Sequence, residues 1–244
     1  MKQPDVAPPK LDRTSALFLD FDGTLSPLQD DPDAVFLSPG MDDVLMQLSE
    51  ALDGALAILS GRDLADLSKR VPDGLWRFGN HGLRAAAPGE DLNEKVPTAP
   101  DLLVSELHAL VDAHEGVRLE EKGPVLAVHY RAAPDKGAQL TRQLEGILAG
   151  YSDYALQSGK MVLEAKPSGA NKGVCLDRAM KQSPFSGRVP VMIGDDKTDE
   201  DAILVSNRLG GWSIKVGEGD SAATYRLKSH QDVETYLKEM LGEL

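Results

Sequence analysis

Short apolar runs alternate with amphipathic stretches along most of this chain. The runs that are rich in Val, Ile, Leu and Phe and bounded by turn residues are 16–19, 55–59, 189–193 and 212–216. Each is too short for a helix, so we predict buried parallel strands. The stretches with apolar residues at helical spacing are 41–52, 63–70, 171–181, 199–206 and 232–241. This alternation predicts an α/β fold, a Rossmann-like open parallel sheet with helices on both faces.

The middle of the chain has a different pattern. Helix-like stretches at 101–113 and 138–149 accompany strand-like stretches at 125–130 and 161–165. These four elements suffice for a small α+β unit with its own core, and prolines cluster at both of its ends. We therefore predict a smaller inserted α/β cap domain at 97–166. The core domain would be discontinuous, with segments 14–96 and 167–244.

Composition limits the environment and the partners. The 39 acidic and 26 basic residues give a formal net charge of −13, which disfavours nucleic acid and anionic membranes as partners. No apolar run approaches the ~20 residues that span a bilayer. Residues 1–13 are polar and proline-rich, and we expect a disordered leader there. The single cysteine, Cys175, excludes an intrachain disulfide and fits a core position better than a nucleophile. We expect a cytoplasmic monomer.

The first apolar run ends in Asp20-Phe-Asp22-Gly23-Thr24. Alternation along an extended segment places the two aspartates on one side. Two close carboxylates stay ionised more easily beside a cation, and a set of oxygen ligands favours Mg²⁺. The Gly-Thr turn can direct backbone N–H groups at an anion. A capping aspartate followed by a turn aspartate would explain a lone D-x-D, but the whole motif after an apolar strand favours a site.

Two weaker motifs occur further along the chain. The second apolar run ends in Ser60-Gly61-Arg62, where a hydroxyl and a glycine N–H could hold a phosphate. Ser60 could equally be the N-cap of the following helix. Lys172 begins the helix-like stretch at 171–181, where its charge opposes the helix dipole unless an anion lies nearby.

An acidic segment, GDDKTDEDA, follows the run at 189–193. Asp195 at the strand end and Asp199 at the next helix start fit a second carboxylate contribution to a metal site. Asp199 and Thr198 also fit an N-cap, and a solvated acidic turn is the simplest alternative.

Together, and in this order, the four motifs resemble the haloacid-dehalogenase (HAD) superfamily of aspartate-nucleophile phosphatases. The resemblance covers roughly 14–96 and 167–244, with 97–166 resembling the cap. It implies that Asp20 attacks phosphorus, forming an aspartyl-phosphate, and that Asp22 acts as general acid and then base. The implied Mg²⁺ ligands are Asp20, Asp22 (through its carbonyl), Asp195 and Asp199. The implied phosphate-binding residues are Gly23, Thr24, Ser60, Gly61 and Lys172.

The segments GNHG at 79–82, E-x-K…H-Y-R at 120–131 and LEAKPSGANKG at 163–173 narrow the resemblance to the trehalose-6-phosphate phosphatases. A small-molecule sugar phosphate is the implied substrate. The substrate-binding residues that follow from this resemblance are Arg62, His81, Glu120, Lys122, His129, Arg131 and Glu164. From composition alone, the charged residues at 120–131 could instead form a solvated sheet face.

Three other functions fit parts of the pattern. Another HAD sugar-phosphate phosphatase, of the sucrose-phosphate or mannosylglycerate-phosphate type, would share the fold and the catalytic residues. A phosphosugar mutase would need a bisphosphate activator and would release no phosphate. A receiver-like phosphoaspartate switch would be about half this length, without an inserted cap or the second aspartate.

Overall fold

The computed structural model describes residues 6–29, 31–90, 92 and 98–244. The chain divides into two compact units. Met1–Leu92 and Asn171–Leu244 form the first, which we call the core, and Asn93–Ala170 form the second, which we call the cap. Each unit has its own hydrophobic cluster, so each is described separately.

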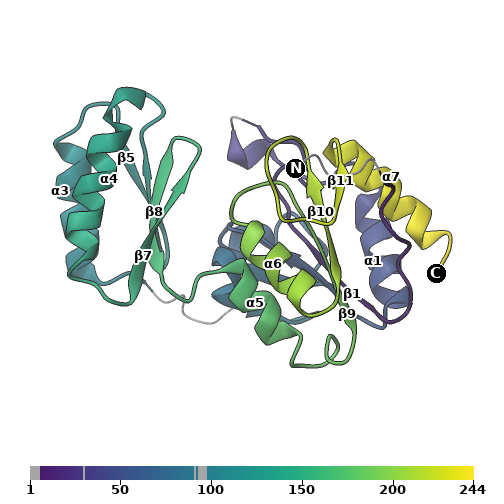
Figure 1. Cartoon of the computed structure of the whole chain (residues 1–244). Helices are drawn as coiled ribbons and strands as arrows, with labels where there is room; N and C mark the ends of the chain where they lie inside the picture. Colours follow the sequence, from purple (N-terminus) through teal and green to yellow (C-terminus); the bar gives the residue numbers. More distant parts are fainter. Residues whose placement is uncertain (1–5, 30, 91, 93–97) are drawn as a thin grey trace. The chain divides into compact units, whose positions relative to one another are not determined.

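The core is built on a seven-stranded sheet in the order β11-β10-β9-β1-β2-β3-β4 (Figure 1). All neighbouring strands are parallel except β3 and β4. The central pair joins distant parts of the sequence, from Ser15↔Val189 to Leu19↔Ile193. The strands are β1 (Ser15–Leu19), β2 (Leu56–Leu59), β3 (Trp76–Gly79), β4 (Arg84–Ala86), β9 (Val189–Gly194), β10 (Trp212–Val216) and β11 (Tyr225–Leu227).

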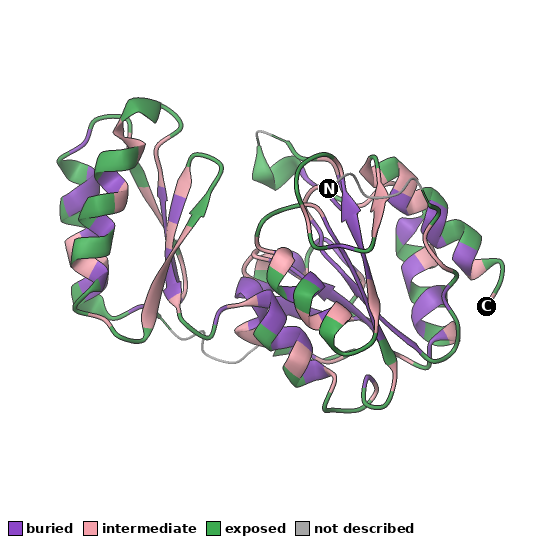
Figure 2. Cartoon of the chain, viewed as in Figure 1, coloured by how far each residue is buried: buried purple, intermediate pink, exposed green. Residues whose placement is uncertain are grey.

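Helices cover both faces of the core sheet, with α1 and α7 on one face and α5 and α6 on the other (Figure 1). The helices of the core are α1 (Met41–Ala51), α2 (Leu64–Leu67), α5 (Lys172–Ala179), α6 (Glu200–Arg208) and α7 (His230–Leu241), with short 3₁₀ turns η1 (Pro32–Ala34) and η2 (Asn80–Gly82). Every residue of β1 and β2 is buried (Figure 2), which is why these strands are continuous apolar runs. The predicted parallel α/β sheet is confirmed.

The sequence pattern missed the outer strands β3, β4 and β11. The segments WRFG, RAA and YRL are short, and each carries an arginine that interrupts the apolar run. The helix predicted at 63–70 is also shorter, because α2 ends at Leu67 and residues 68–70 form a turn.

The cap is a four-stranded antiparallel sheet, in the order β5-β6-β8-β7, with α3 and α4 packed on one face (Figure 1). Its elements are α3 (Asp101–Asp112), β5 (Arg118–Lys122), β6 (Val125–His129), η3 (Pro134–Lys136), α4 (Gly137–Leu148), β7 (Tyr154–Gly159) and β8 (Val162–Pro167). The pattern predicted only two of the four strands, β6 and β8. Both missed strands lie at edges of the sheet and contain no fully buried residue.

Part of the expected disordered leader is ordered. Leu11 is buried against α7, where its N–H points to Met240 Sδ at 3.2 Å. The Tyr236 hydroxyl donates to the Pro9 carbonyl at 2.8 Å. The expectation is therefore wrong for residues 9–11, because one apolar side chain and one carbonyl find partners on α7. Residues 1–5 of the leader, and residue 97 at the predicted cap boundary, lie outside the described residues.

Within the described ranges, the helices are all too short or too polar to cross a membrane. Cys175 is buried, as expected for a core residue.

Candidate active site

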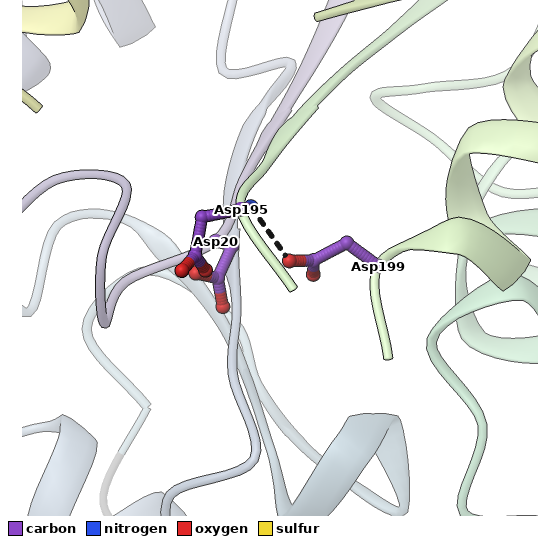
Figure 3. A group of neighbouring side chains, drawn as sticks. All are labelled: Asp20, Asp195 and Asp199. Carbon is purple, nitrogen blue, oxygen red and sulfur yellow. Dashed lines mark hydrogen bonds between the residues drawn. The ribbon is translucent and has the colours of Figure 1, made fainter. Parts of the chain in front are cut away.

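Three carboxylates meet at the carboxyl edge of the core sheet. Asp20 follows β1, Asp195 follows the adjacent strand β9, and Asp199 precedes α6. One oxygen of each lies within 4.8 Å of the others (Figure 3). Because the ends of neighbouring parallel strands share one edge, residues 175 positions apart are brought together here. With Lys172, we call these residues the core cluster.

Two glycines allow this close approach. Gly23 has φ +86°, and a Cβ on it would lie 2.2 Å from Asp195 Oδ2. A Cβ on Gly194 would lie 2.4 Å from Asp199 Cγ. Any larger residue at either position would therefore displace an acidic side chain of the site.

Lys172 lies between two of the carboxylates. Its Nζ donates to Asp20 Oδ1 at 2.6 Å and to Asp199 Oδ1 at 2.6 Å, and its side chain is only 3% exposed. Asn171 caps helix α5 by accepting from Val174 N at 3.0 Å, and this fixes the start of the helix. The two carboxylates supply the anions that a lysine at a helix N-terminus needs.

Asp199 does not cap α6 with its side chain. Its Oδ2 accepts from the backbone N–H group of Asp195 at 2.9 Å (Figure 3). The same oxygen accepts from the backbone N–H group of Asp196 at 3.0 Å. Asp199 thus occupies the N-cap position, as the sequence allowed, but its side chain holds the loop after β9 instead of the helix. Thr198 does not cap α6 either, since its hydroxyl donates to Asp196 Oδ1 at 2.7 Å.

Burial dominates the electrostatics of this cluster. Burial raises the pKa of Asp20 to about 7, because the nearby Asp195 and Asp196 carboxylates offset the opposing charge of Lys172. Burial also raises the pKa of Asp195 to about 7, with Asp199 and Asp196 adding to the rise. For Lys172 burial disfavours the charge, but Asp199 and Asp20 outweigh it and raise the pKa well above its ordinary value.

These residues fit a divalent cation. The donor set consists of carboxylate oxygens, which hard cations prefer. Lys172 contacts Asp20 and Asp199, and it adds one positive charge to three crowded carboxylates, so a cation would relieve their mutual repulsion.

Two buried oxygens at this edge have no hydrogen-bond partner among the residues that the structure describes. They are Asp20 Oδ2 and Thr24 Oγ1. Thr24 is completely buried, and a buried polar atom without a partner is costly. Asp20 therefore has one oxygen held by Lys172 and a second one available to a ligand.

Ser60 and Gly61 follow β2, the strand that pairs with β1 on the other side from β9. Ser60 is buried, and its Oγ accepts from Arg62 N at 3.1 Å, so it forms a local turn. Its carbonyl accepts from His81 N at 2.9 Å. The His81 ring packs on Gly61, where a Cβ would lie 2.6 Å from His81 Cε1. Close packing is thus one reason for a glycine at position 61.

The Asp22 carboxylate is outside the core cluster. It forms a two-pronged ion pair with Arg62, from Nε to Oδ2 at 2.8 Å and from Nη2 to Oδ1 at 2.6 Å. Two residues predicted for different roles, proton transfer and substrate binding, therefore contact each other directly.

On the cap, four of the predicted substrate-binding residues share one face of the sheet. Glu120 Oε2 lies 2.7 Å from His129 Nε2 and 3.6 Å from Lys122 Nζ. Glu164 Oε1 lies 3.9 Å from Lys122 Nζ. Glu120 and Glu164 flank Ala127 in the sheet register. We call Glu120, Lys122, His129 and Glu164 the cap cluster.

Two neighbouring residues lie elsewhere. Arg131 is exposed, in the turn after β6. Glu121 points to the opposite side of β5 from Glu120 and pairs with His108 of α3 at 2.9 Å. The E-x-K spacing thus selected the glutamate that lies beside Lys122.

Lys215 on β10 was missed by sequence reasoning. It is buried, and its Nζ donates to the Asp195 carbonyl and, at 2.6 Å, to the Val216 carbonyl. It steadies the loop that carries Asp195, and its charge opposes the rise in the pKa of that carboxyl. A lysine inside the apolar run WSIKV was the signal that could have revealed it.

Comparison with known proteins gives one consistent result. The family model described as trehalose-phosphatase matches residues 18–231. The trehalose-6-phosphate phosphatase of Escherichia coli strain K12 is 37% identical over 98% of this chain and 91% of its own length. A probable trehalose-phosphate phosphatase of Sinorhizobium fredii is 42% identical, over 83% of this chain and 77% of its own. The Aspergillus fumigatus trehalose-6-phosphate phosphatase structure superposes with a TM-score of 0.68 at 26% identity, covering 98% of this chain and all of that one.

Proposed function

The chain belongs to the trehalose-phosphatase family, and from this premise we propose that it hydrolyses trehalose 6-phosphate to trehalose and inorganic phosphate. The reaction class is phosphoric monoester hydrolysis. The observation that carries the proposal is the state of Asp20, which is buried, held by Lys172 through Oδ1, and left without a hydrogen-bond partner at Oδ2 among the described residues. This is the arrangement that a positioned nucleophile needs.

In the proposed first step, Asp20 Oδ2 attacks phosphorus and the bond from phosphorus to the sugar oxygen breaks. Asp22 gives its proton to that oxygen, which leaves as the sugar hydroxyl. In the second step Asp22 takes a proton from water, and the water oxygen attacks phosphorus. The bond to Asp20 then breaks and inorganic phosphate is released.

Lys172, Ser60 and Thr24, with the N–H groups of Gly23 and Gly61, are proposed to bind the phosphoryl oxygens. Lys172 and Thr24 are supported by their burial, and Thr24 also by its unpartnered hydroxyl at the edge where Asp20 lies. Asp20 and Asp195 would hold Mg²⁺ with the Asp22 carbonyl, and Asp199 completes the acidic set. Bound Mg²⁺ would screen the repulsion between carboxylate and phosphate.

The cap cluster is proposed to bind the sugar hydroxyls, with Arg131, Arg62 and His81 as further contacts. Alternating carboxylates and cations on one sheet face supply both acceptors and donors, which suits a ligand rich in hydroxyl groups. We further propose that the protein is cytoplasmic, since its single cysteine is buried and free, and that it is a monomer.

The test is phosphate release by the purified protein from a panel of sugar phosphates, with Mg²⁺ and with a chelator. The panel contains trehalose 6-phosphate, sucrose phosphate, mannosylglycerate phosphate and glucose 6-phosphate. We expect fast, Mg²⁺-dependent release from trehalose 6-phosphate. Release from trehalose 6-phosphate that is no faster than release from glucose 6-phosphate would overturn the substrate assignment. Full activity in the chelator would overturn the proposed requirement for a metal ion.

A further inference from the structure

A row of alternating charges connects Asp22 with two arginines and a second aspartate. Arg62 binds Asp22 with two of its nitrogens, and its third, Nη1, donates to Asp66 Oδ2 at 2.9 Å. The Phe21 ring lies 5.4 Å from the Arg62 guanidinium carbon. Every nitrogen of this side chain therefore has a carboxylate partner.

Asp66 is itself held from the other side. Arg70 donates from Nε to Asp66 Oδ2 at 3.0 Å and from Nη2 to Asp66 Oδ1 at 2.8 Å. The Arg70 side chain is 4% exposed, and its Nη1 donates to the Val35 carbonyl at 2.6 Å. Asp66 thus links the Arg62 guanidinium to a buried anchor.

The local fold explains this row. Of these three residues only Asp66 lies in α2; Arg62 precedes the N-cap residue Asp63, and Arg70 lies in the turn that follows the helix. The spacing of four positions on either side brings both arginines to Asp66. Two-pronged arginine–carboxylate pairs fix direction as well as distance. Both oxygens of Asp66 are engaged, and hydrogen bonds from Arg70 and Arg62 keep its pKa below the ordinary value in spite of burial.

We propose that Asp66 is a positioning residue for the proton transfer made by Asp22. The inference rests on the proposed function, in which Asp22 protonates the sugar oxygen. To do so, Asp22 must turn one oxygen from Arg62 towards the leaving group. By holding Nη1 of the guanidinium, Asp66 keeps Arg62 in place when Asp22 turns away from it. A displacement of about 1 Å at such a site can cost about 10²-fold in rate.

The test compares two substrates in one protein sample. Trehalose 6-phosphate has an alkoxide leaving group that needs a proton, whereas p-nitrophenyl phosphate releases a stable anion that does not. For each substrate kcat/KM reports the steps up to phosphoryl transfer, before the shared hydrolysis step. The ratio of the two kcat/KM values is independent of the fraction of folded enzyme.

In Asp66→Asn we expect this ratio, trehalose 6-phosphate over p-nitrophenyl phosphate, to fall by about tenfold or more. The matched control is Asp63→Asn, which removes the same charge from the N-cap of the same helix, where asparagine caps equally well. The control should leave the ratio within about twofold of wild type, as expected for a change confined to a helix cap that contacts none of the charged residues in the row.

An unchanged ratio in Asp66→Asn overturns the inference, even if both activities fall together. If that variant does not fold, Asp66→Glu is used, because it retains the charge that Arg70 needs but shifts the carboxylate. A fall of the ratio in Asp66→Glu then supports the inference, and an unchanged ratio overturns it. A wild-type enzyme that prefers another sugar phosphate overturns the proposed substrate alone, because the ratio is then measured with that substrate.

Discussion

The core cluster and the cap cluster contain the same kinds of side chains in opposite environments. In the core, Lys172 is 3% exposed and contacts two carboxylates at 2.6 Å. In the cap, Glu120 is 40% exposed and the lysine contacts are 3.6 and 3.9 Å long. Burial moves pKa values far in the core, whereas the cap cluster remains close to solvent.

The difference fits the two proposed roles, which are chemistry for the core cluster and substrate recognition for the cap cluster. A nucleophile benefits from fixed, desolvated partners, because the cost of orienting them is met during folding. A sheet face that is proposed to bind a sugar has to exchange water for hydroxyl groups, so a side chain in contact with solvent, such as Glu120, suits it. The following predictions test this contrast, from the largest expected effect to the smallest.

Asp20→Asn should abolish turnover, by at least about 10³-fold in kcat, because the proposed nucleophile is removed. The thermal unfolding midpoint should stay close to wild type, since asparagine retains the shape and can still accept from Lys172. Phosphate release and calorimetry measure the two effects. Asp177→Asn, a substitution in a surface ion pair, is the control and should retain full activity. Turnover within tenfold of wild type would exclude the covalent mechanism.

Lys172→Met should lower the free energy of unfolding by about 3 kcal/mol or more in chelator, because two buried carboxylates lose their partner. Denaturant titration measures the loss. The matched control is Lys181→Met, whose lysine is 72% exposed in its pair with Asp177 and should cost less than about 1 kcal/mol. Equal losses of unfolding free energy in the two variants would contradict the claim that the buried ion pairs of Lys172 stabilise the fold more than an exposed pair does.

Glu164→Gln should raise KM for trehalose 6-phosphate by about tenfold, since one charge-assisted contact to the sugar is lost. Turnover of p-nitrophenyl phosphate, which has no sugar, should be unchanged. Glu121→Gln on the opposite side of the cap sheet serves as the control and should change neither activity. If both substrates are affected alike, the cap cluster is not a recognition surface.

Glu120 should give the cap a small acid sensitivity. The hydrogen bond with His129, helped by Lys122 and opposed by burial, lowers the pKa of this carboxyl. A lowered pKa stabilises the folded state above the unfolded pKa of about 4.3, and the gain is lost as the pH falls through the folded value. Glu120→Gln should therefore cost less than about 1 kcal/mol at pH 7 and less again at pH 3. Denaturant titrations at the two pH values measure this, and an equal cost at both would contradict it.

The sequence predicted what depends on local pattern. The strands that carry Asp20, Asp195 and Ser60 are buried apolar runs, and their order alone placed the three motifs at one edge. Strand β5 was missed because RLEEK buries none of its residues fully. The pair formed by Asp22 and Arg62 depends on side-chain directions across 40 positions, which spacing does not encode. The same holds for Asp199, whose side chain turns back to β9 instead of capping α6.

The order of the chain has a consequence for its synthesis. Strand β1 pairs with β9 on one side, from Ser15↔Val189 onwards, while the whole cap is contiguous in the sequence. A ribosome completes the cap before it reaches β9, so the cap can fold while β1 still lacks one neighbour. Asp20 leaves the ribosome more than a hundred residues before Lys172, Asp195 and Asp199. A chain released early would therefore carry the proposed nucleophile without its partners, and we expect it to be inert.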